Sequence, residues 1–136
     1  MRIAHLGFVT KDIDLVLNSW INSGYLVKVP KTFDPIQNVF CLLLGKDGET
    51  DIELVSPGYG GKNPLNSRLS RGGGLDHVCF YTYEIERSLE LERSNQSIVV
   101  CEPVFAETFK RRVAFVVRRG GMLVEFMEED KPAQWT

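Results

Sequence analysis

The sequence predicts an α+β fold made of two similar halves, each with one strand, one helix and three further strands. An internal repeat at an offset of 72 residues aligns His5 with His77 and Glu53 with Glu125. In each half, short apolar runs of strand length are interrupted by one stretch with helical periodicity. The chain has 136 residues, of which 43% are hydrophobic and 25% charged, as in a globular chain of single-domain length.

The first half begins with a strand over residues 2–9, which is apolar on both alternations and therefore predicted to be covered on both faces. Thr10 and Asp12 are typical of a helix start, and Gly24 is typical of a helix end. Between them the apolar residues recur at helical spacing: Ile13, Val16, Leu17, Trp20 and Ile21. Three further strands are predicted at 25–29, ended by Pro30, at 38–44 and at 50–56, with a loop over 31–37.

The second half repeats this order after a glycine-rich connection. We expect a first module over 1–57, a connecting loop over 58–73 with a short helix at 64–69, and a second module over 74–128. The elements of the second module are a strand at 75–82, a helix at 84–93 and strands at 97–101, 112–117 and 122–128. Residues 129–136 are predicted to form a surface tail of the single domain 1–136.

Charge and composition argue against several classes of protein. The net charge is −2 and the basic residues are scattered, which argues against a nucleic-acid partner. Apolar runs stay well short of the roughly 20 residues that span a bilayer, so no membrane partner is expected. The N-terminus has no secretory signal pattern, and the three cysteines have no CxxC spacing. We therefore expect a cytoplasmic protein with reduced thiols.

Two histidines and two glutamates that obey the same offset are the candidate functional residues. An isolated carboxylate on the inner face of a sheet costs several kcal/mol, so Glu53 and Glu125 should be paired, protonated or bound to metal. Taken singly, His5 or His77 is more often a hydrogen-bonded core residue, and either glutamate a solvent-facing one. The shared offset favours a common site, and two imidazoles with two carboxylates suit Zn²⁺, Ni²⁺, Co²⁺, Mn²⁺ or Fe²⁺.

Nearly the whole chain, over residues 2–128, resembles the vicinal oxygen chelate superfamily, which includes glyoxalases, bleomycin resistance proteins and dioxygenases. The motifs that carry the resemblance are His5-Leu6-Gly7, Ile52-Glu53-Leu54-Val55-Ser56-Pro57, Gly73-Gly74-Leu75-Asp76-His77, Arg112-Val113-Ala114-Phe115 and Leu123-Val124-Glu125-Phe126. Methylmalonyl-CoA epimerases and their glyoxalase-like relatives are the most similar branch. The resemblance implies two tandem βαβββ modules whose curved mixed sheet surrounds one divalent metal ion per chain, usually in a homodimer. His5, Glu53, His77 and Glu125 match the metal ligands of the family.

The resemblance also implies a reaction. Its substrates present two adjacent oxygens to the metal, and a carboxylate removes a proton from the neighbouring carbon. We expect Glu125 to be that base and Glu53 to act from the opposite side, in an epimerase or isomerase whose small-molecule substrate is an acyl-CoA or another α-oxygenated acid. One position departs from the epimerase pattern, because Ile36 stands where epimerases carry a further acid/base glutamate.

Other functions remain open on the same scaffold. A lyase of the glyoxalase I type is one alternative, and a ring-cleaving dioxygenase is another, although dioxygenases usually have a His/His/Glu set. A non-catalytic binding or resistance module is a third, but such proteins commonly lack the metal ligands. Asn63 in the connecting loop is predicted to border the substrate cleft. Arg111 and Arg112 could hold a substrate carboxylate or CoA phosphate, or simply begin a solvated strand.

Overall fold

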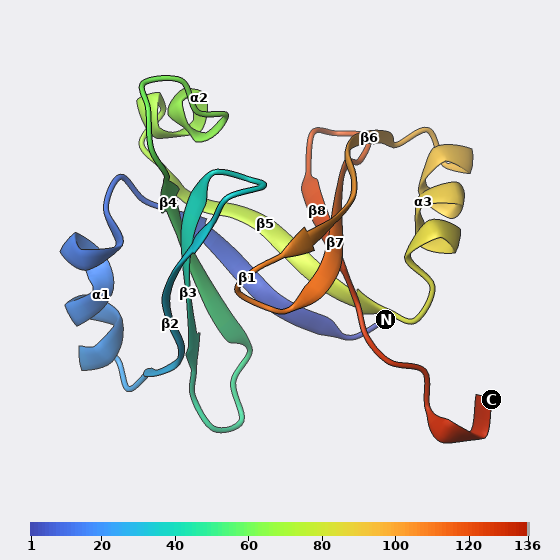
Figure 1. The fold of residues 1–136 in the computed structure, drawn as a ribbon, viewed down its shortest axis with the longest axis horizontal. Coiled ribbons are helices and arrows are strands. Elements are labelled where there is room, and N and C mark those ends of the chain that lie inside the picture. Colours follow the sequence, from blue (N-terminus) through green and yellow to red (C-terminus); the bar gives the residue numbers. More distant parts are fainter. Residues whose placement is uncertain (136) are drawn as a thin grey trace.

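The structure, a computed structural model, describes residues 1–135. Within these residues, eight strands form one sheet that curls into a half-barrel with few helices around it (Figure 1). The predicted α+β fold is therefore confirmed, and residue 136 of the predicted tail lies outside the described residues. The strands are β1 (Ile3–Val9), β2 (Leu26–Asp34), β3 (Val39–Gly45), β4 (Asp51–Pro57), β5 (Gly74–Thr82), β6 (Ile98–Ala106), β7 (Arg111–Val117) and β8 (Leu123–Glu128). The helices are α1 (Ile13–Asn22), α2 (Leu65–Ser70), α3 (Ile85–Ser94) and the 3-10 helix η1 (Ala133–Trp135).

The strand order relates the two halves by an approximate twofold axis. The order is β2-β3-β4-β1-β5-β8-β7-β6, so each half repeats the other when β1 is matched to β5 and β4 to β8. β1 and β4 are parallel, as are β5 and β8, whereas β1 and β5 are antiparallel and join the halves. These two strands cross the middle of the molecule, with α1 and α3 at opposite ends (Figure 1).

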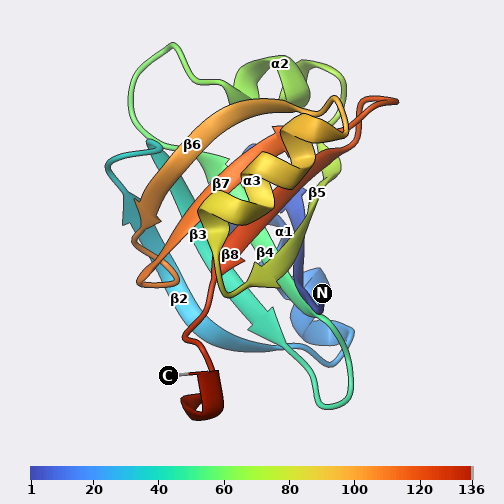
Figure 2. The same cartoon turned by 90° about the vertical axis from the view of Figure 1, so that its right-hand side faces the viewer.

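The outer face of the sheet is covered by α1 and α3. Ile13 of α1 is fully buried and packs with Leu44 of β3, while Ile85 and Leu89 of α3 pack with Phe126 of β8. α3 lies across the second half of the sheet (Figure 2). Each such side chain contributes about 1.5–3 kcal/mol when fully buried. The helices are therefore held on the convex side, and the concave side is left for a site.

The helix boundaries follow the sequence signals. α1 begins after Asp12, whose carboxylate accepts the N–H of Asp14 at 2.9 Å. The chain leaves α1 through Gly24, which has φ +98°.

In the described part of the chain, no helix has the length and hydropathy needed to cross a membrane.

Two strands are longer than predicted. β2 continues past Pro30 to Asp34, where a loop was expected, and β6 continues past Pro103 to Ala106. Both strands lie at the edges of the sheet. On its outer side an edge strand has no partner strand, so a proline there, which lacks an N–H group, costs no hydrogen bond between strands. The pairing register shifts near each proline, between Val29 and Thr32 and between Cys101 and Val104. The predicted strand end at Pro30 was therefore wrong, and so was the predicted end of the other strand at residue 101.

The inner face of the sheet carries the polar side chains. In β4, Ile52 and Leu54 pack beneath α1 on the outer face, whereas Glu53 and Val55 line a cavity on the inner face. The same alternation in β8 places Phe126 beneath α3 and Glu125 on the inner face. The period of two residues thus directs the predicted site residues toward the concave side.

Candidate metal centre

Two rows of residues across the middle of the sheet build the centre. In row 1, the pairing register places Gly7 of β1 between Glu53 of β4 and His77 of β5. In row 2, it places Cys79 of β5 between His5 of β1 and Glu125 of β8. Each row therefore holds a glutamate, a small residue and a histidine. The small residue gives the two longer side chains room to reach the middle.

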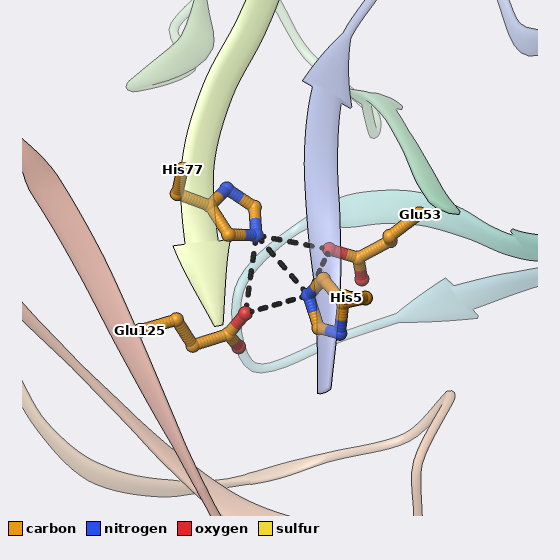
Figure 3. Close-up of side chains that lie close together, drawn as sticks. All are labelled: His5, Glu53, His77 and Glu125. Atoms are coloured by element: carbon orange, nitrogen blue, oxygen red, sulfur yellow. Dashed lines mark hydrogen bonds and ion pairs between the residues drawn. The ribbon is translucent and has the colours of Figure 1, made fainter. Parts of the chain in front are cut away.

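The four ligand atoms of these rows converge on one point (Figure 3). His5 Nε2 lies 3.3 Å from His77 Nε2, 3.2 Å from Glu53 Oε1 and 3.0 Å from Glu125 Oε1. His77 Nε2 lies 3.2 Å from Glu53 Oε1 and 3.1 Å from Glu125 Oε1. All four atoms lie within 4.8 Å of one another. The structure thus brings together the four residues that the repeat singled out.

The centre is buried, and its ionisable groups shift one another's pKa values. His5, Glu53, His77 and Glu125 are each at most 5% exposed. Burial opposes protonation of His5, but Glu53 and Glu125 outweigh it and raise the pKa of His5 to about 9. The pKa of His77 is likewise raised against burial, by Asp76, Glu125 and Glu53. The two imidazoles in turn lower the pKa of Glu53 and of Glu125, although burial raises both. In the metal-free chain, protons on the histidines therefore offset the two carboxylates.

The donor set fits a divalent metal ion. Two ligand atoms with bonds of about 2.0–2.2 Å to one ion, at right or tetrahedral angles, lie about 2.8–3.6 Å apart. The five separations of 3.0–3.3 Å fall in this range. Two carboxylates and two imidazoles supply the charge and the nitrogen and oxygen ligands that Zn²⁺ and its neighbours in the first transition row accept. The residues present could therefore hold such an ion.

The two histidines have different support. Nδ1 of His77 donates to Asp76 Oδ2 at 2.9 Å, which leaves Nε2 as the nitrogen that can bind metal once its own proton is displaced. Asp76 is itself paired with Nε of Arg68, on α2, at 3.3 Å. The ring of His5 instead stacks on Phe109 at 5.0 Å, and its Nδ1 has no hydrogen-bond partner within residues 1–135. Asp76 therefore orients one imidazole, while the other is held by packing.

Replacing Asp76 with alanine is expected to weaken metal binding by about 10–100-fold, because His77 loses the acceptor that orients its ring. Competition with a coloured chelator, using Co²⁺ or Zn²⁺, measures the dissociation constant. Asp51→Ala is the matched control, since Asp51 is also ion-paired, through Lys28 Nζ at 2.7 Å. Equal dissociation constants for the Asp76 and Asp51 variants would show that the carboxylate does not support the centre.

A cavity of about 440 Å³ opens from the centre. Glu53, His77 and Glu125 form part of its lining, together with Asn63 and Leu65 from the segment that joins the halves. Its size is within the usual range for small-molecule sites. A small ligand in this cavity would therefore contact the four-residue centre directly.

The other predicted residues differ in their placement. Asn63 lines the cavity, as expected from its position in the connecting loop. Arg112 is bonded to Glu86 and Glu128, and Arg111 lies 3.9 Å from Asp130. Among the described residues that line the cavity, neither arginine is present. Their binding of substrate stays a prediction, and the geometry lends it no support.

Residues at the cavity mouth were only partly anticipated from the sequence. Ile36 lines the cavity, where it has no titratable group. The nearby Asp34 is 1% exposed, and its carboxylate accepts the N–H groups of Ile36, Gln37 and Glu107. Because Glu107 follows the other edge strand, Asp34 connects the two edges of the half-barrel. Its role is therefore to join these segments.

Gly7 and Asp76 were not singled out from the sequence. A side chain at Gly7 would overlap the imidazole ring of His77, so the glycine is required for that ring to occupy its position. Asp76 stands directly before His77, and an acidic neighbour of a candidate ligand is a detectable signal. Cys79 is fully buried and packs with Ala4 and Val113.

A curled half-barrel with a buried two-histidine, two-glutamate cluster, open to a cavity, defines an α+β protein able to hold a metal ion at its centre. The model of the Glyoxalase/Bleomycin resistance protein/Dioxygenase superfamily matches residues 4–115. The chain belongs to this superfamily, as the sequence motifs predicted. No functionally curated protein matches it significantly.

Solved structures share the fold over nearly their whole length. A hypothetical protein from Bacillus halodurans C-125 is 28% identical, with a TM-score of 0.79 and coverage of 97% of this chain and 96% of that chain. Methylmalonyl-CoA epimerase from Mycobacterium tuberculosis is 21% identical, with a TM-score of 0.81 and coverage of 98% and 90%. A Streptomyces coelicolor methylmalonyl-CoA epimerase variant in complex with 2-nitronate-propionyl-CoA is 22% identical, with a TM-score of 0.81 and coverage of 97% and 99%. The two epimerases, at these identities, show a shared fold.

The homodimer and the cytoplasmic location stay predictions.

Proposed function

We propose that this protein is a divalent-metal-dependent epimerase or isomerase that moves a proton at the carbon next to a carbonyl group. The observation that carries the proposal is the convergence of His5, Glu53, His77 and Glu125 at the inner end of a cavity of ligand size. Similarity to methylmalonyl-CoA epimerases supports the scaffold but leaves the substrate open. The intact set of four residues argues against a binding module without chemistry.

The chemistry divides between the centre and the cavity walls. One divalent ion per chain (Zn²⁺, Ni²⁺, Co²⁺, Mn²⁺ or Fe²⁺), held by the four residues, would supply positive charge beside the substrate oxygens, where negative charge develops in the reaction. Glu125 accepts the proton from the carbon, and Glu53 returns one from the other flank. The two glutamates suit these roles because both line the cavity and come from β8 and β4, on either side of the central β1–β5 pair. Their lowered pKa values keep both deprotonated at neutral pH, so Glu125 is in the form that accepts a proton, whereas Glu53 must first take up a proton from water before it returns one to the carbon.

A lyase of the glyoxalase I type is the second candidate. The observation that favours it is Ile36, which lines the cavity where a dedicated second acid/base residue was expected. Asp34 does not replace that residue readily, because its carboxylate already accepts several N–H groups. Production of a lactoyl thioester from methylglyoxal and a thiol would favour the lyase over the epimerase.

The first experiment is elemental analysis of protein purified without added metal, followed by proton exchange. We expect about one divalent ion per chain. Incubation with a series of acyl-CoA thioesters in deuterated water should replace the α-proton with deuterium, as followed by NMR, and a chelator should stop the exchange. Metal-loaded protein that exchanges none of these protons would count decisively against the epimerase.

The stabilisation that metal confers should increase with pH. The pKa of His5 is raised from its ordinary 6.5 to about 9, so protonated His5 stabilises the metal-free fold below pH 6.5, and this contribution is lost as pH rises through about 9. Metal binds the neutral imidazole and must displace that proton. The free energy of unfolding gained from a fixed concentration of free metal should therefore rise between pH 6.5 and 9, by about 1.4 kcal/mol per pH unit for each proton displaced. Thermal melts with and without metal at several pH values provide the measurement, and a gain independent of pH would contradict the displacement of protons.

A further inference from the structure

The walls of the cavity beyond the centre are apolar and come from both halves. Val39, Val55 and Leu65 line one side, and Val104, Phe109 and Phe115 line the other. Phe109 and Phe115 also contact the imidazole rings of His5 and His77, at 5.0 and 5.4 Å between ring centroids. A group attached to the chelated oxygens would therefore lie among aliphatic and aromatic side chains. An engineered apolar cavity of about 150 Å³ already binds benzene, so 440 Å³ leaves room for a ring or a branched chain.

Apart from the histidine of the centre, the ionisable side chains that line the cavity and carry charge at neutral pH are all acidic. Its acidic lining residues are Asp34, Glu53, Asp76 and Glu125, and none of the described lining residues is a lysine or arginine. A divalent ion would offset the two glutamates, and Arg68 with His77 offsets Asp76. Asp34 has only N–H groups as its described hydrogen-bond partners. A second substrate carboxylate, away from the centre, would thus be buried without a cation, which is costly.

Two carboxamide side chains at the cavity wall, those of Asn63 and Gln37, already make hydrogen bonds within the protein. Asn63 Nδ2 donates to the carbonyl oxygen of Asn38 at 2.8 Å, and Asn63 Oδ1 accepts the N–H of Leu65 at 3.0 Å. Gln37 Nε2 donates to Asp34 Oδ2 at 3.2 Å. The hydroxyl of Thr108 also lines the cavity and has no hydrogen-bond partner among the described residues. All these groups are uncharged, so beyond the centre a substrate meets apolar walls and a few neutral polar groups but no cation.

From these three observations we infer the substrate class of this site, on the basis of the proposed function. The substrate carries two adjacent oxygens for the centre and, next to them, an uncharged apolar group larger than a methyl group. It has no second carboxylate within the cavity. A thioester whose α-carbon carries a carboxylate, for the second oxygen, and a branched or aromatic group belongs to this class, whereas one whose α-substituent carries a further carboxylate extending away from the centre does not.

Hydroxamic acids test this inference, because they bind metal ions through two adjacent oxygens. Acetohydroxamate, benzohydroxamate and 4-carboxybenzohydroxamate are titrated into protein loaded with Co²⁺, and binding is followed by visible absorbance. Benzohydroxamate should bind at least about tenfold more tightly than acetohydroxamate, through the apolar walls. The 4-carboxy derivative should bind at least about tenfold more weakly than benzohydroxamate, because its carboxylate finds no cation.

A charge-adding variant provides the matched control. Ile36→Lys places a cation at the cavity mouth and should narrow the difference between benzohydroxamate and its carboxylated derivative. Ile21→Lys places the same charge at a partly exposed position of α1 and should leave the difference unchanged. The protein could bind all three hydroxamates equally, or prefer the carboxylated one, while it still exchanges α-protons. Either result overturns the substrate class alone. Protein that retains no metal overturns the proposed function and this inference together.

Discussion

Replacing Glu125 with glutamine is expected to lower turnover by about 10²–10⁴-fold while leaving metal at least partly bound. The amide keeps an oxygen ligand beside His5 and His77, which lie 3.0 and 3.1 Å from the present carboxylate oxygen. It cannot accept a proton from carbon at neutral pH. Parallel measurements of α-proton exchange and metal content separate these two effects.

The matched control for this substitution is Glu90→Gln on the exposed face of α3, which should leave exchange unchanged. Glu53→Gln tests the second proton carrier. If Glu53 returns the proton on the opposite face, this variant should still exchange the proton of one stereoisomer but fail to interconvert the two. Unchanged exchange in the Glu125 variant would remove Glu125 from the proton-transfer role.

Gly7→Ala is expected to destroy metal binding although residue 7 contributes no ligand. A Cβ at this position would overlap the imidazole of His77, so the ring must rotate away from Glu53 and Glu125. We expect metal affinity to fall by more than about 100-fold and the metal-free protein to lose about 1–3 kcal/mol in free energy of unfolding, as for other overpacked sites. Gly61→Ala is the control, because a Cβ at Gly61 meets open space.

A double-mutant cycle identifies the cause of the Gly7 effect. If the alanine methyl group clashes with His77, then removing that ring should restore stability, so Gly7→Ala/His77→Ala should be more stable than the sum of the single changes predicts. Metal binding should remain lost in the double variant. Strictly additive changes in the free energy of unfolding would exclude the clash as the cause.

The sequence predicted the elements well but not all of their limits. Apolar periodicity and the cap at Asp12 located α1, and the 72-residue offset predicted that β5 to β8 repeat β1 to β4. Pro30 was read as a strand end and the strand at 97–101 was ended too early, although Pro30 and Pro103 both lie within edge strands. Whether a strand is at an edge depends on the order of strands in the sheet, and no local pattern reports that order. For the same reason, the contact between Asp34 and Glu107, about one repeat apart, could not be expected.

By itself, the sequence determined the fold class and singled out His5, Glu53, His77 and Glu125, because metal chemistry restricts residue types and a duplicated chain repeats them at a constant offset. Tertiary structure decided how these residues meet. Cross-strand register placed Gly7 between Glu53 and His77, since only pairing between strands determines which residues are neighbours across a sheet. It also decided the character of the cavity, whose walls come from segments far apart in the chain and whose described lining residues include no lysine or arginine.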